Sequence, residues 1–76
     1  MIIATSHDDN CIRSLINLLE KQYPGMPFEM RMVNISLIEI HDDEIESWEN
    51  TNPGIFDKML EFVSGYTIGW DNALNN

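Results

Sequence analysis

The sequence predicts an α+β domain in which a small antiparallel sheet of two or three strands packs against two longer helices. Two long stretches carry apolar residues at helical spacing. Three short stretches are rich in β-branched residues or alternate between apolar and polar residues, as strands do. The expected order is β-α-β-β-(short α)-α, and residues 1–76 form a single domain, because 76 residues supply only one thin core.

The first strand and the first helix are expected in the N-terminal third of the chain. Residues 1–5 are mostly apolar and include adjacent isoleucines, which is typical of a short buried strand. Ser6 is the expected N-cap of a helix that runs from about residue 7 or 8 to residue 22. Pro24 and Gly25 then end this helix. Its apolar stripe consists of Ile12, Leu15, Ile16, Leu19 and Tyr23.

The middle of the chain predicts two further strands. Residues 28–33 alternate between apolar and polar side chains, and residues 36–41 are again rich in large apolar residues. Two arrangements fit: a tight hairpin centred near residues 33–35, or one long strand interrupted by a bulge. The hairpin is preferred, although it lacks the glycine that such turns favour. The residues expected to face the core are Phe28, Met30 and Met32.

A short helix is expected after the strands, with Asp42 or Asp43 as its cap and Trp48 at its end. Ile45 lies three residues before Trp48, so the two share one helical face. Residues 49–54 are polar apart from Pro and Gly, and we interpret them as a loop.

The last helix is expected over about residues 53–74, with Thr51 or Asn52 as its N-cap and Pro53 in its first turn. Its apolar stripe consists of Phe56, Met59, Leu60, Val63, Tyr66, Trp70 and Leu74. Small residues recur every four positions at Gly65, Gly69 and Ala73. The preferred interpretation is that another element crosses closely there; the alternatives are a helix that stops at Gly65 and a kink used in binding.

The charge of the chain excludes several classes of partner. Thirteen acids stand against four Lys and Arg residues, which gives a formal net charge of -9. Nucleic-acid phosphates and anionic lipids would be repelled, so direct nucleic-acid binding and membrane binding are not expected. The single cysteine cannot form an internal disulfide, which favours the cytoplasm. No signal peptide or membrane-spanning apolar stretch is recognised, so we expect a soluble protein.

Motifs for catalysis are missing, so we expect neither an enzyme nor a cofactor. The sequence contains no glycine-rich phosphate loop and no serine nucleophile elbow. His7 and Cys11 lie four residues apart and could face one metal ion together with His41 or Asp42. Nothing in this spacing requires a metal, and none is expected. Cys11 is interpreted as a small packing residue.

The most unusual feature is an acidic stretch over residues 39–49, which holds six carboxylates and no Lys or Arg. It is either a solvated face that keeps a small domain soluble or a surface for a basic partner. In the second case an exposed Trp48 ringed by carboxylates would be a binding hot spot. Trp48 and Trp70 are more often at least partly core residues in so small a domain. The expected partner-binding residues are Glu39, Asp42, Asp43, Glu44, Glu46, Trp48 and Glu49, with Asp57 and Glu61 as a second acidic patch.

These features favour a small acidic inhibitor that binds and blocks a basic protein such as a nuclease or another nucleic-acid-binding complex, in part by nucleic-acid mimicry. In size and charge the chain resembles phage anti-defence proteins such as anti-CRISPR and anti-restriction proteins, although it carries no family motif. The alternative is a structural or adaptor subunit that docks a partner helix, or a second copy as a homodimer, through the apolar helix face near Gly65 and Gly69.

Overall fold

Six elements make up the fold in the computed structural model, which describes residues 1–74, with the backbone alone for Gly69 and residues 71–74. Their order confirms the predicted α+β arrangement. The elements are β1 (Ile2–Ser6), α1 (Asp9–Gln22), β2 (Glu29–Met32), β3 (Ser36–Glu39), α2 (Asp42–Thr51) and α3 (Ile55–Leu74).

The sheet has the strand order β1-β3-β2, and both pairings are antiparallel. Ile38 of the central strand lies opposite Ala4 on one side and Met30 on the other. A bulge between Ile2 and Ala4 shifts the register of β1. The strands β2 and β3 form the predicted hairpin, and the Val33 N–H donates to the Ile35 carbonyl across its turn at 3.1 Å.

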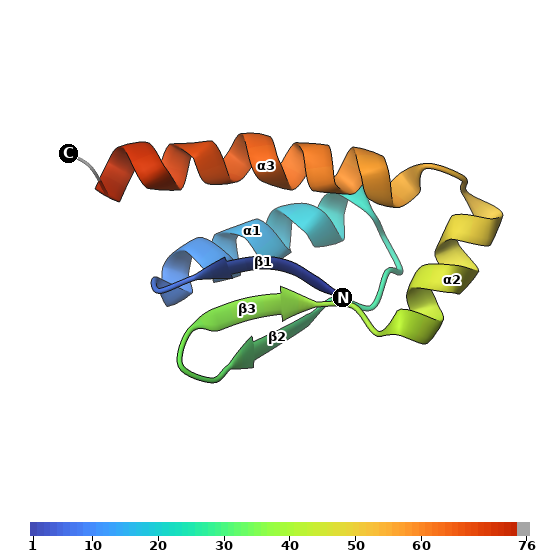
Figure 1. Cartoon of the computed structure of the whole chain (residues 1–76), viewed down its shortest axis with the longest axis horizontal. Helices are drawn as coiled ribbons and strands as arrows, with labels where there is room; N and C mark the ends of the chain where they lie inside the picture. Colours follow the sequence, from blue (N-terminus) through green and yellow to red (C-terminus); the bar gives the residue numbers. More distant parts are fainter. Residues whose placement is uncertain (75–76) are drawn as a thin grey trace.

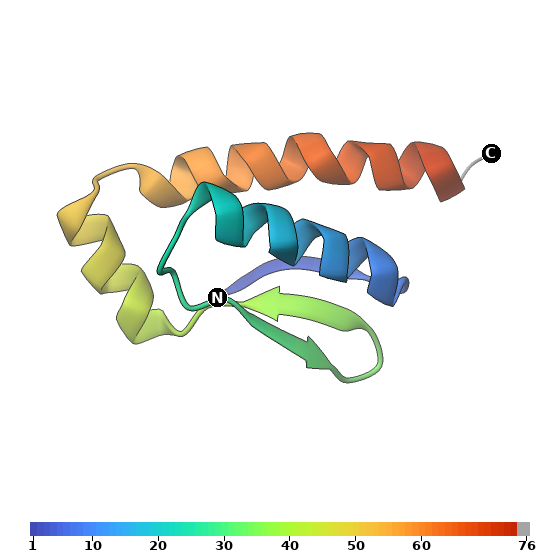
Figure 2. The ribbon, with the colours of Figure 1, turned by 180° about the vertical axis from the view of Figure 1, so that it is seen from behind.

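The core lies between the sheet and the two long helices. The helix α1 covers one face of the sheet and contacts all three strands, whereas α3 runs beside α1 and contacts only β1 of the sheet (Figures 1 and 2). Burying a large aliphatic side chain stabilises a fold by about 1.5–3 kcal/mol, so these contacts supply most of the stability of so small a domain. The largest fully buried side chains are Ile12, Leu15, Leu19, Ile38, Ile40 and Met59.

The first helix has the predicted stripe but a different N-cap. Its N-cap is Asp8, whose carboxylate accepts from the Asn10 N–H at 2.9 Å. Ser6 instead belongs to β1, and its hydroxyl accepts from the Asp8 N–H at 3.0 Å. The Ser6 prediction was therefore wrong by two residues, because the strand extends one residue further than expected and carries Ser6 with it.

The junction between α2 and α3 also differs from the prediction. The helix α2 is longer than expected and continues through residues 49–51, and its N-cap is His41 rather than Asp42 or Asp43. Asn52 is the C-cap of α2, with its N–H donating to the Trp48 carbonyl at 2.8 Å. A left-handed Gly54 (φ 86°) separates the two helices. For this reason α3 begins at Ile55, and Pro53 lies in the turn rather than in the first turn of α3.

Two expectations about packing are corrected. Met32 is 60% exposed rather than buried, because it lies at the end of an edge strand. Gly65 is exposed, and apart from its chain neighbours and the backbone of its own helix no described atom lies within 4 Å of the position a Cβ would take. Within residues 1–74 no element crosses α3 at Gly65, and the helix continues past this residue to Leu74. The predicted continuation of this small-residue stripe, Gly69 and Ala73, lies outside the described side chains.

Candidate acidic partner-binding surface

The helix α2 lies at one end of the molecule, where it connects the sheet to α3 (Figure 1). Its first turn carries Asp42, Asp43 and Glu44. Carboxylates at a helix N-terminus interact favourably with the helix dipole, by about 0.3–1 kcal/mol each. His41, the N-cap, makes no side-chain capping hydrogen bond. These acids therefore have a structural role at this helix end in addition to any role in binding.

The solvent-exposed part of α2 carries four carboxylates: Asp42, Asp43, Glu44 and Glu46. We call these four residues the acidic face of α2. Asp43 and Glu46 lie three residues apart, a spacing that sets Cβ atoms about 5–6 Å from each other. The part of the chain that the structure describes places no basic side chain of Lys, Arg or His within ion-pair distance of this face.

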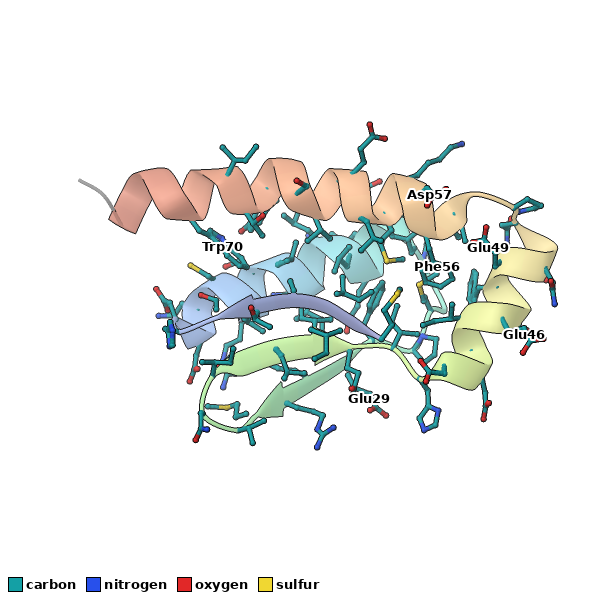
Figure 3. The ribbon with its side chains drawn as sticks, in the orientation of Figure 1. Glu29, Glu46, Glu49, Phe56, Asp57 and Trp70 are labelled. Atoms are coloured by element: carbon teal, nitrogen blue, oxygen red, sulfur yellow. The ribbon has the colours of Figure 1, made fainter. Side chains whose placement is uncertain are left out.

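The second predicted patch lies on α3. Asp57 and Glu61 are both exposed, and they are four residues apart, so they share one side of the helix. Figure 3 shows Asp57 near the start of α3 and Glu46 on α2, both toward the same end of the molecule. The two helices contact each other across the turn at residues 52–54. The fold thus brings Asp57 and Glu46, one acid from each patch, toward the same end of the molecule.

Two of the predicted residues already have a cationic partner within the chain. Glu39 accepts from Arg31 on the neighbouring strand at 3.1 Å. Asp42 lies 3.2 Å from the amino group of Met1, and its side chain is 90% exposed. Exposed ion pairs of this kind contribute about 0–1 kcal/mol. A partner's lysine or arginine could therefore replace either contact at little cost.

Glu49 differs from the other acids because its carboxylate turns inward. Its Oε1 accepts from the Gly54 N–H at 2.8 Å, directly before α3 begins. Its Oε2 is buried and has no hydrogen-bond partner among the described residues. Figure 3 shows Glu49 directed toward the junction with α3, close to the labelled Phe56. Glu49 thus stabilises the turn between the two helices through its hydrogen bond with Gly54. No sequence pattern around Glu49 predicted this role.

Trp48 is half-buried and packs against the core together with Ile45. This agrees with the interpretation of Trp48 as a partly core residue rather than a fully exposed hot spot. Part of the Trp48 surface lines a shallow hollow with Ser47, Thr51 and Asn52. The apolar residues of α2 therefore fix the helix to the domain, and the carboxylates are the groups left for contacts with a partner.

Two observations concern the metal-binding and nucleophilic residues in the part of the chain that the structure describes. No group of three or more His, Cys, Asp or Glu side chains there could hold a metal ion. Burial, and then the nearby charge of Asp8, raises the pKa of the Cys11 thiol. A raised pKa keeps the thiol protonated and a poor nucleophile near neutral pH.

A shallow groove between β1 and α3 was not predicted from the sequence. It encloses about 380 Å³ and is lined by Ile3, Ala4, Thr5, Leu60, Val63, Ser64, Thr67 and Trp70. Trp70, the last lining residue along α3, packs edge-on against Tyr66, with ring centroids 5.7 Å apart. Among the described residues no ionisable side chain lines the groove. The groove arises from the packing of α3 beside β1, which no local sequence pattern specifies.

Comparison with protein families, with curated proteins and with solved structures finds no match for this chain. None of the helices within residues 1–74 combines the length and the apolar character needed to cross a membrane.

Proposed function

We propose that this protein is a small acidic inhibitor that binds a basic, nucleic-acid-handling protein and blocks its nucleic-acid site. The observation that carries the proposal is the acidic face of α2 (Asp42, Asp43, Glu44 and Glu46), which is exposed and has no Lys, Arg or His partner in the described residues. A net charge of -9 on 76 residues adds a long-range attraction to any basic surface.

The spacing of the carboxylates suits the mimicry of nucleic acid. Asp42 and Asp43 lie four and three residues before Glu46, so their Cβ atoms are about 5–6 Å from that of Glu46. This distance is of the order of the spacing of phosphates along a strand. A Lys- and Arg-lined channel that binds phosphates would accept such a row of carboxylates. Asp57 of α3, which lies toward the same end of the molecule, would extend the contact, and Glu61 lies one turn further along the same helix. The lone cysteine is consistent with action in the reducing cytoplasm.

The inhibitor proposal is tested by a matched pair of charge reversals. Glu46 on α2 and Glu20 on α1 are both exposed helical glutamates without a described ion pair. We expect Glu46→Lys to weaken binding to a basic partner strongly, because it places a cation in the contact. Glu20→Lys changes the net charge equally and should alter binding only slightly. Equal loss in both variants would mean that overall charge, rather than the acidic face of α2, determines binding.

A second candidate function is an adaptor that docks a partner through α3. Leu60 and Ile68 are exposed on this helix, at 39% and 60%, and Leu60 borders the groove beside β1. Such a partner would bind through apolar contacts and would resist high salt. Leu60→Asp would weaken its binding, whereas Glu46→Lys would leave it unchanged.

A further inference from the structure

Strand β2 forms a free edge of the sheet. It is the last strand in the order β1-β3-β2, and within residues 1–74 only β3 and α1 contact it. Figures 1 and 2 both show its outer edge uncovered, on the side of the sheet away from α3. The unpaired N–H and C=O groups of such an edge can pair with another strand.

The hydrogen bonds of the central strand define which backbone groups point outward. The Met1 amino group donates to the Ile40 carbonyl at 2.6 Å, and the Ile40 N–H donates to the Met1 carbonyl at 2.9 Å. Ile40 therefore directs its backbone groups toward the β1 side. Alternate residues of an antiparallel strand face alternate neighbours. Ile38 thus also faces β1, and Leu37 and Glu39 face β2.

This alternation continues into β2. Glu29 and Arg31 lie opposite Glu39 and Leu37, so their backbone groups point toward β3. Met30 directs its N–H and C=O to the free edge, as does every second residue from it. A strand that pairs with this edge must therefore place residues whose own N–H and C=O groups point toward β2 opposite Met30 and opposite every second residue from Met30.

The charges on β2 are complementary to a second copy of the same strand. Glu29 lies directly opposite the like-charged Glu39, and both are on the sheet face that α1 does not cover. If two β2 strands pair antiparallel about Met30, Glu29 of each copy lies opposite Arg31 of the other. Two other registers, shifted by two residues in either direction, also bring the outward-pointing N–H and C=O groups of the two strands together. One of them places Glu29 opposite Glu29 of the other copy, and the other places Arg31 opposite Arg31. Only the register about Met30 combines matched backbone groups with opposite charges.

We propose that the protein forms a symmetric dimer through its β2 strands, joining two sheets into one of six strands. Pairing covers apolar surface at the edge, where Met32 and Val33 are 60% and 71% exposed. Residues directly opposite each other point to the same face, so both copies carry α1 on one side. Strands lie about 4.8 Å apart, and the two β3 strands of the dimer are three strand spacings from each other. The two α1 helices, each lying over the β3 strand of its own copy, are therefore about 14 Å apart and do not clash. The dimer leaves α2 free in both copies, so this proposal is independent of the inhibitor function.

Sedimentation analysis of the full chain tests this dimer at about 0.15 M salt, where the Debye length of about 8 Å screens most of the repulsion between the two acidic copies. We expect a weak dimer that dissociates between about 10 μM and 1 mM, as is usual for a small interface. Arg31→Glu and Glu29→Arg each replace two attractive cross-strand pairs with two repulsive pairs. Each should weaken dimerisation roughly thirtyfold.

The decisive experiment mixes the two variants. The Arg31→Glu variant carries acids at positions 29 and 31, and the Glu29→Arg variant carries bases at both. A mixed dimer therefore regains both opposite-charge pairs. We expect the mixed dimer to form, whereas each variant alone stays monomeric. Circular dichroism verifies that each variant is folded, and Glu29→Lys with Arg31→Asp replaces the pair if one does not fold. Lys58→Glu, on α3, is the control and should dimerise normally. A wild type that is monomeric at about 1 mM, or a mixture that stays monomeric, would overturn the proposal.

Discussion

Replacing Gly65 with alanine tests directly whether α3 is open at this position. Gly65 is exposed, and a Cβ there would meet no described atom within 4 Å beyond its chain neighbours and the backbone of its own helix. Alanine is favoured over glycine inside a helix by about 0.8–1.0 kcal/mol. Because no contact opposes this gain, Gly65→Ala should raise the free energy of unfolding by about that amount. In a domain of this size, about 1 kcal/mol moves Tm by about 4–8 °C.

The assay is thermal and urea denaturation followed by far-UV circular dichroism. Gly54→Ala is the matched control, because Gly54 also has open space around its Cβ position but has a φ of 86°. A non-glycine residue in this left-handed region costs about 1–2 kcal/mol, so Tm should fall in this variant. A lower Tm for Gly65→Ala would mean that a segment packs closely against α3 there, and the account of an open helix would be refuted.

Three further predictions concern the core, the junction and the thiol. Met59 is fully buried, so Met59→Ala should lower the free energy of unfolding by about 2–5 kcal/mol in urea denaturation. Glu49→Ala removes the acceptor for the Gly54 N–H and should cost about 1 kcal/mol, whereas the exposed Glu46→Ala should stay within about 0.5 kcal/mol of wild type. Burial and Asp8 raise the pKa of Cys11, so iodoacetamide should alkylate the folded protein at pH 8 more slowly than the urea-unfolded chain. Because the folded pKa lies above the unfolded value, stability should also fall as pH rises above about 8.5, and Cys11→Ser should reduce this fall.

Periodicity predicted the elements of the fold well where one face of an element is buried. Ile12, Leu15 and Leu19 recur at helical spacing, and all three are fully buried beneath the sheet. The hairpin was also predicted, because the alternating residues of β2 precede a second β-rich stretch. Periodicity reports burial on one face, so it could not predict that Met32 at the end of an edge strand is exposed.

Element boundaries were harder to predict because tertiary contacts determine them. The polar residues 49–51 suggested a loop, but they complete α2, and the Glu49 carboxylate accepts from Gly54 in the following turn. Small residues on α3 suggested a close crossing, which depends on the path of distant segments and does not occur at Gly65.

The candidate site could be predicted in composition but not in detail. The sequence identified the acidic stretch, and the structure places its exposed acids on α2 at one end of the molecule. The sequence alone could not distinguish Glu49, whose carboxylate accepts from Gly54 at the helix junction, from the solvent-exposed Glu46. Both are glutamates of the same helix, and they differ in the direction in which they leave its axis. Nor could the sequence assign Arg31 to Glu39, because a strand pairing brings these side chains together.

The most direct test of the inhibitor proposal is the capture of partners from a bacterial lysate on immobilised wild-type, Glu46→Lys and Glu20→Lys protein, with elution by salt and by duplex DNA. The account predicts one basic, nucleic-acid-binding protein that wild type and Glu20→Lys capture, that Glu46→Lys does not capture, and that salt or DNA releases. A partner that resists both eluents and binds Glu46→Lys as well as wild type would contradict it.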